Sequence, residues 1–111
     1  MPMPKIDKAN INKPLCYDPA RKKYIFFPDI VSGKEKIIPI ETLDEDDLKK
    51  LVIERHRLGP DYTVQAMSGP LLSRDDVIQA IEENAPFGRV TLEAEKSALQ
   101  DLLSTIRKNL K

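Results

Sequence analysis

Reactive and metal-binding side chains are scarce in this chain. It contains one cysteine, Cys16, one histidine, His56, and no tryptophan. A single cysteine cannot form an intrachain disulfide, and one cysteine with one distant histidine lacks the paired spacings of a zinc site. Residues 44–47 are four consecutive acids, but they lack the alternating ligands and the glycine of a calcium loop. We therefore expect neither a metal site nor a cofactor.

Long apolar runs and an excess of charge of either sign are also absent. Lys and Arg number 18, and Asp and Glu number 18, so the net charge exerts no overall attraction on nucleic acid or an anionic surface. No stretch approaches the roughly 20 apolar residues of a membrane span. The N-terminus lacks the apolar run of a signal peptide. We expect a cytoplasmic protein without membrane association.

The 111 residues, 41% of them hydrophobic, predict a single domain with one modest core. Residues 1–14 contain three prolines and few side chains to bury. This composition predicts a flexible N-terminal arm before a domain that spans residues 15–111.

Strand-forming residues concentrate in the first third of the domain. Short strands are predicted at residues 15–17, 24–27 and 36–40, with turns at residues 18–21 and 32–34. Pro39 cannot donate to a ladder, so the third strand is expected to lie at an edge or to turn this backbone position outward. Residues 62–67 alternate in polarity and predict a further strand.

Three segments have the apolar spacing of amphipathic helices. They are residues 44–58, capped by Thr42 or Asp44 and stopped by Gly59 and Pro60; residues 74–84, capped by Ser73; and residues 92–110, capped by Thr91. Glu95 is placed near the positive end of the last helix dipole. The order of elements predicts an α+β fold, with three helices on one face of a small, mostly antiparallel sheet of three to four strands.

Arg55 lies inside the apolar stripe of the 44–58 helix when residues are counted at about 100° each. A cation there must extend its head to water or pair with an acid or a backbone carbonyl. Two interpretations stay open: Arg55 caps the carbonyls of the last turn, or it presents charge with His56 and Arg57 to an anionic partner.

The last helix has more large aliphatic side chains than a small sheet can readily cover. These either complete one monomer core or leave part of the stripe as a surface for a partner. The sequence favours a non-catalytic protein–protein interaction or assembly module that uses helix faces, with a homodimer as one form of assembly. The candidate partner-binding residues are Arg55, Arg57, Leu102, Ile106 and Leu110.

Two alternative hypotheses belong to other functional classes. Arg21, Lys22 and Lys23 lie beside Tyr24, and with the cluster at residues 55–57 they suggest a nucleic-acid-binding protein. An enzyme would have to be built around His56, with Cys16 as a conceivable thiol partner. Because no further member of a catalytic triad is visible, the sequence leans against an enzyme.

Overall fold

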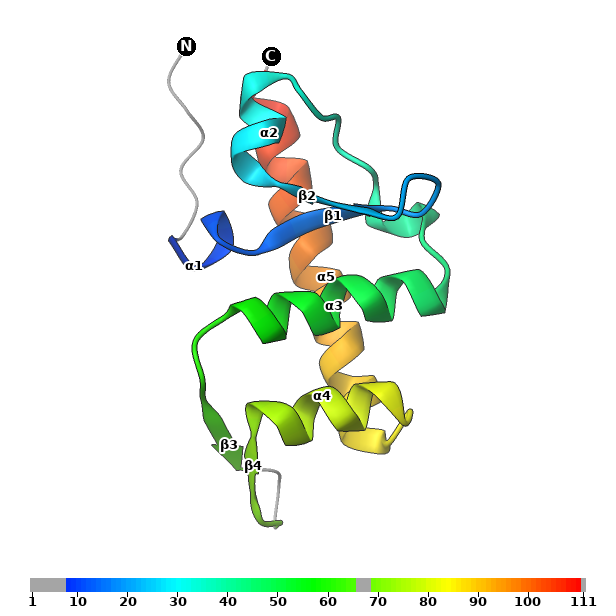
Figure 1. Ribbon diagram of the computed structural model, residues 1–111, viewed down its shortest axis with the longest axis vertical. Coiled ribbons are helices and arrows are strands. Elements are labelled where there is room, and N and C mark those ends of the chain that lie inside the picture. The colour runs from blue at the N-terminus through cyan, green and yellow to red at the C-terminus, as the bar shows by residue number, and fades with distance from the viewer. Residues whose placement is uncertain (1–7, 66–68, 111) are drawn as a thin grey trace.

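The computed structural model describes residues 8–65 and 69–110, which are organised along one long helix (Figure 1). This helix, α5 (Pro86–Asn109), extends along a molecule that measures 47 by 28 by 19 Å. α3 (Glu45–Leu58) crosses the middle of α5, and α4 (Arg74–Glu82) packs against its N-terminal part. No helix in the described part of the chain is long and apolar enough to cross a bilayer.

The strands form two separate hairpins. β1 (Pro14–Asp18) pairs antiparallel with β2 (Lys23–Phe26), and β3 (Thr63–Gln65) pairs antiparallel with β4 (Leu71–Ser73). Each hairpin is its own two-stranded sheet. The α+β class is confirmed, but the prediction of one sheet with three to four strands is not, because the strands are divided between these two hairpins.

The strand predicted at residues 36–40 does not form. α2 (Phe27–Ser32) begins directly after β2, with a proline in its first turn, and ends at Gly33, which has a φ of 84°. The chain then runs irregularly to a 3₁₀ turn, η1 (Ile40–Thr42). Pro39 has no amide hydrogen to donate to a ladder, and the α2 helix separates this segment from β2.

Residues 8–14 of the predicted N-terminal arm lie within the described part of the chain. α1 (Lys8–Ile11) forms within the predicted arm, and Pro14 is buried at the start of β1. Residues 1–7 of the predicted arm lie outside the described residues. Of the strand predicted at residues 62–67, residues 63–65 form β3, and residues 66 and 67 lie outside the described part of the chain.

The last helix starts six residues earlier than predicted, at Pro86. Gly88, which precedes the helix expected at residues 92–110, is buried within the first turns of α5. A Cβ on Gly88 would lie 2.1 Å from the carbonyl oxygen of Ala80, so glycine permits α4 and α5 to approach closely. Thr91 is therefore not the N-cap, and its hydroxyl donates to the carbonyl oxygen of Phe87.

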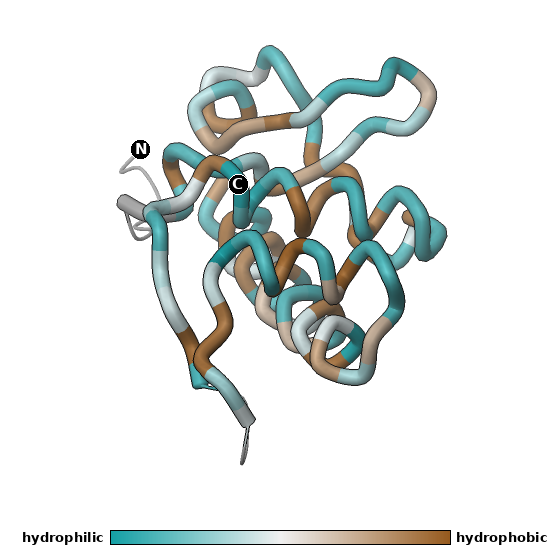
Figure 2. The backbone as a smooth tube through the Cα atoms, turned by 60° about the horizontal axis from the view of Figure 1, so that its bottom comes forward, coloured by the Kyte–Doolittle hydropathy of each residue, from teal (hydrophilic) through white to brown (hydrophobic). Residues whose placement is uncertain are grey.

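The two other predicted helices begin at the caps that the sequence indicates. Asp44 accepts the amide hydrogen of Asp47, and Ser73 forms a reciprocal capping box with Asp76. Hydrophobic positions recur along each helix (Figure 2), and their inward side chains join those of β1 and β2 in one core. This core fixes the ends of α3, α4 and α5 around the candidate site.

Candidate functional site

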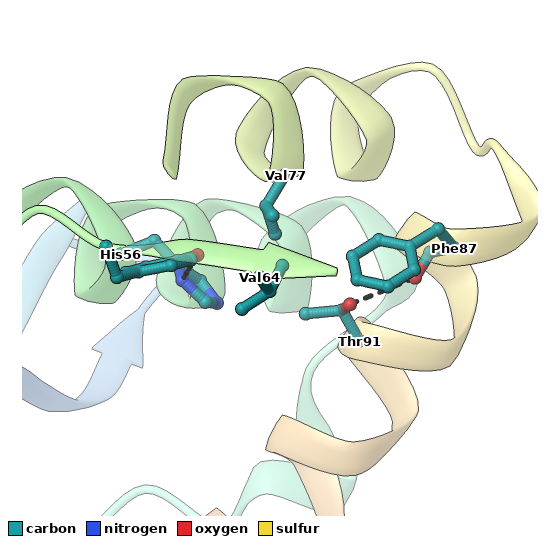
Figure 3. Close-up of a pocket in the computed structure, with 6 residues that line it drawn as sticks. His56, Val64, Val77, Phe87 and Thr91 are labelled. Carbon is teal, nitrogen blue, oxygen red and sulfur yellow. Dashed lines mark hydrogen bonds between the residues drawn. The ribbon is translucent and has the colours of Figure 1, made fainter. Parts of the chain in front are cut away.

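A small pocket lies where β3, α3, α4 and α5 meet (Figure 3). Its volume is about 200 Å³. The lining side chains come from all four elements and from the segment that joins α3 to β3; they are His56, Tyr62, Val64, Val77, Phe87 and Thr91. Apart from the imidazole, the phenol and a threonine, the walls are aliphatic or aromatic carbon.

The turn after α3 brings Tyr62 back onto His56. α3 ends at Gly59, and Pro60 prevents its continuation. The guanidinium of Arg74 holds the turn by donating from Nη1 to the carbonyl oxygen of Gly59 at 2.9 Å. The Tyr62 hydroxyl then lies 2.6 Å from His56 Nδ1. His56 and Tyr62, which are six residues apart, are thus brought into contact by the turn and not by helical spacing.

The apolar walls follow from strand register and helical period. Val64 and Leu72 are cross-strand partners, so they share one face of the β3–β4 hairpin. Phe87 and Thr91 lie one turn apart on α5 and face the same side. Because the Thr91 hydroxyl is already bound to a backbone carbonyl, it is not a free donor in the pocket.

Glu95 does not line the pocket but lies beside His56, whose Nε2 makes no hydrogen bond within the described residues. Its Oε1 lies 3.4 Å from His56 Nε2, and its Oε2 lies 4.0 Å from Arg55 Nε. An ionised carboxylate only accepts hydrogen bonds, so it favours the proton on Nε2 of a neutral imidazole. Nδ1 is then an acceptor, and the Tyr62 hydroxyl donates to it. We assign this tautomer from the arrangement of the partners.

Burial lowers the pKa of His56, and the nearby cations Lys13 and Arg55 lower it further, while Glu95 acts in the opposite direction. The imidazole is therefore neutral at neutral pH. Burial and the charge of Glu95 raise the pKa of Tyr62, which keeps the phenol protonated. The pair therefore holds a protonated phenol 2.6 Å from a neutral imidazole.

Arg55 is buried and acts as a structural tie, which differs from both sequence interpretations. Its guanidinium donates to the carbonyl oxygen of Pro14 at 3.0 Å and to Asn10 Oδ1 at 2.7 Å. It therefore links α3 to α1 and β1, and it does not bind the carbonyls of its own last turn. Arg57 is exposed and pairs with Glu54 on the same helix.

The three aliphatic candidates on α5 differ in exposure. Ile106 is fully enclosed in the core, so its side chain is not available to a partner in this fold. Leu102 and Leu110 are half-buried and pack against the core edge. Ile106 thus packs within one chain, whereas Leu102 keeps part of its surface exposed.

The basic residues of the first hairpin are largely paired with acids. Arg21 and Lys23 both donate to the carboxylate of Glu35, and Arg21 also binds Asp18. Lys22 is exposed at the turn, with a φ of 51°. Two of the three candidate cations, Arg21 and Lys23, are therefore already bound to the buried carboxylate of Glu35.

Cys16 and His56 do not form a pair. Cys16 is buried in β1, and burial raises the pKa of its thiol to about 11. Both nitrogens of His56 face other groups, namely the Tyr62 hydroxyl and the Glu95 carboxylate. Within residues 8–65 and 69–110, no group of three or more His, Cys, Asp or Glu residues is arranged to hold a metal ion.

Sequence reasoning missed Tyr62 and Glu95 as partners of His56. A signal for Glu95 existed, because it lies three residues after Leu92 and four before Leu99, on the side of α5 that faces the core. An acid in that position predicts a buried cation opposite it, and Arg55 was the available candidate. For Tyr62, the signal was its position two residues after Pro60, where the chain has left α3 and can turn back toward the end of that helix.

Comparisons of this chain with protein-family models, with curated proteins and with solved structures find no match. The functional inference therefore depends on the pocket and the surface next to it.

Proposed function

We propose that this chain is a small, non-catalytic protein-binding module whose pocket receives an apolar side chain from a protein partner. The observation that supports this proposal is the pocket itself, an open hollow of about 200 Å³ with mainly apolar walls from four elements. Ligand sites for drug-sized molecules occupy roughly 300–1,000 Å³. The smaller volume suits one large side chain better than a nucleotide-sized cofactor.

A surface on α5 extends from the pocket and suits a bound segment. Phe87, Thr91, Ala94, Ala98 and Leu102 recur at spacings of three and four residues, so they share one side of the helix. Ala94 and Ala98 are exposed, and their small side chains permit close approach. A partner helix or extended segment along this side can insert one anchor into the pocket and reach Leu102, which the sequence had indicated.

Nucleic-acid binding has less support than protein binding. Arg21 and Lys23 share the carboxylate of Glu35, and Arg57 is paired with Glu54. Arg55 is buried against Pro14. Binding to phosphates requires cations that can leave their present partners and neutralise the backbone, and these four begin already paired or enclosed.

The proposal is tested by selecting peptides from a displayed library on the immobilised full chain. Affinities of the selected peptides are then measured for Val64→Glu, which places a charge in the pocket wall. Thr63→Glu is the matched control, because Thr63 is the exposed neighbour on the same strand. We expect Val64→Glu to weaken binding at least about tenfold, since a charge is costly in an apolar site, and Thr63→Glu to leave it unchanged.

Equal binding to both variants, or a library that yields no binder, contradicts the proposed function. Amide spectra of both variants check that the fold is retained. Light scattering at increasing protein concentration tests self-assembly. If the native chain has the mass of two chains and Val64→Glu has the mass of one, the partner is a second copy of this chain.

A further inference from the structure

A second pocket lies between η1 and the C-terminal half of α5, and its volume is about 190 Å³. Gln100, Ser104 and Arg107 recur at spacings of four and three residues, so they share one side of α5. Glu41 of η1 lines the same pocket. Unlike the pocket beside His56, this one presents mostly polar surface and is less open to solvent.

This polar surface comes mainly from side chains. The carbonyl oxygen of Pro39 already accepts bonds from the amide and the hydroxyl of Thr42. The carbonyl oxygen of Ile40 accepts the amide hydrogen of Leu43. The pocket residues of α5 lie inside the helix, where backbone groups bond to one another. The groups that remain for a ligand are therefore those of the polar side chains.

The polar side chains of this pocket have unused bonding groups. Within residues 8–65 and 69–110, the side chains of Glu41, Gln100, Ser104 and Arg107 form no ion pair and no hydrogen bond. The hydroxyl of Thr105 bonds back to the carbonyl oxygen four residues earlier, as is common in helices, whereas the Ser104 hydroxyl does not. Arg107 and Glu41 thus bring opposite charges to one hollow without neutralising each other.

We propose that this pocket binds a small zwitterion, an α-amino acid with a short aliphatic side chain, with its carboxylate on Arg107 and its ammonium group on Glu41. A planar guanidinium binds a carboxylate through two parallel hydrogen bonds. An ammonium group only donates, and the carboxylate of Glu41 only accepts. Ser104 and Gln100, one and two turns before Arg107, add neutral donors for the ligand carboxylate. A ligand with a single charge would leave one of the two charged residues unmatched.

The volume and the apolar part of the lining set the size of the ligand. Ile40 and Leu103 are buried beneath the polar groups, and Pro39 lies beside them half-buried, so aliphatic carbon forms the base of the pocket. An apolar cavity of about 150 Å³ holds benzene. At the same space for each non-hydrogen atom, about 190 Å³ holds roughly eight such atoms, which is the size of valine.

The test titrates the full, isotope-labelled chain with L-valine, L-valinamide and N-acetyl-L-valine, and follows the amide shifts of the protein. L-Valinamide keeps the ammonium group but lacks the carboxylate, and N-acetyl-L-valine keeps the carboxylate but lacks the ammonium group. We expect L-valine to shift the amides of Ile40, Glu41, Leu103 and Ser104. Each analogue should bind at least about fivefold more weakly, because it loses one charge-assisted contact.

Two variants assign the two contacts. Arg107→Gln should weaken L-valine at least about fivefold and remove its advantage over L-valinamide, whereas Glu41→Gln should remove its advantage over N-acetyl-L-valine. Lys108→Gln and Glu45→Gln are the matched controls, because both residues are exposed outside the pocket and the changes in net charge are the same. Amide spectra without ligand check that all four variants keep the native fold.

Several results would overturn the zwitterion site. They are equal affinity for L-valine and either analogue, shifts confined to another surface, no shift with L-valine, and control variants that weaken L-valine as much as the pocket variants do. The two pockets share no lining residue. Failure of the zwitterion site therefore leaves the proposed protein-binding function to its own test, and failure of that function leaves the zwitterion site to this one.

Discussion

Replacement of Arg55 by methionine is the most direct test of how this fold holds its N-terminal segment. The guanidinium lies under the first strand and donates to the Pro14 carbonyl oxygen at 3.0 Å and to Asn10 Oδ1 at 2.7 Å. Methionine keeps much of the apolar stem but removes every donor. The variant therefore leaves a buried carbonyl without its partner and leaves the carboxylate of Glu95 without its nearby cation.

The expected cost follows from these contacts. Hydrogen bonds that involve a charged group contribute about 1.5–3 kcal/mol each, and the removal of one partner from a buried charge pair costs about 3–5 kcal/mol. Burial lowers the pKa of Arg55, which reflects the desolvation cost that methionine avoids. We therefore expect the free energy of unfolding to fall by about 3 kcal/mol, a large part of the roughly 5–15 kcal/mol that typical domains possess.

Urea denaturation measures this change. With a denaturant slope of about 1.5 kcal/mol per molar, the midpoint should fall by about 2 M, with the slope itself unchanged. Arg57→Met is the matched control, since Arg57 is exposed and its pair with Glu54 is worth less than about 1 kcal/mol. Glu95→Gln added to Arg55→Met should recover part of the loss, because it removes the uncompensated carboxylate.

A loss below about 1 kcal/mol in Arg55→Met would refute the view that this arginine ties α1 and β1 to α3. Equal losses in Arg55→Met and Arg57→Met would likewise show that position in the fold is irrelevant to the effect.

Three further predictions concern the packing and titration of single residues. Gly88→Ala should destabilise the fold by about 1–3 kcal/mol in urea denaturation despite the better helix propensity of alanine, because the new Cβ would overlap the Ala80 carbonyl; a stabilised variant would contradict this. Arg21 and Lys23 hold the pKa of Glu35 at about 2. The native chain should therefore melt at a higher temperature than Glu35→Gln above about pH 4.5, and this difference in melting temperature should disappear as the pH falls toward 2. A difference that persists near pH 2 would argue against the pairing. Burial raises the pKa of Cys16 to about 11, so a disulfide reagent near pH 8 should label it only after denaturation, and rapid labelling of the folded chain would show that the thiol is accessible.

The parts of the fold that the sequence predicted are those with local chemical causes. Asp44 and Ser73 each accept an amide hydrogen from the residue three positions later, and these caps identify the starts of α3 and α4 without reference to the rest of the chain. Gly59 with Pro60 likewise identifies the end of α3. In each case, the signal and the structure lie within a few residues of one another.

The errors arise where distant packing decides the local structure. Gly88 resembles a helix break until Ala80 is placed against it, after which glycine is what allows α5 to begin at Pro86. Leu71 is 66% exposed and belongs to a three-residue strand, so its pairing depends on β3 and gives no strong periodic signal of its own. Ile40 is buried like a strand residue, but it lies in a 3₁₀ turn.

The candidate site shows the same dependence on long-range contacts through Glu95. If α5 began at residue 92, Glu95 would be an acid near the positive end of the helix, with its charge explained by the dipole. Because α5 begins at Pro86, Glu95 instead lies in its interior turns, between Arg55 and His56. The carboxylate favours the proton on Nε2 of the imidazole, and this leaves Nδ1 to accept the proton of Tyr62. The position of Glu95 beside Arg55 and His56 therefore depends on a helix start that only the contact between α4 and α5 determines.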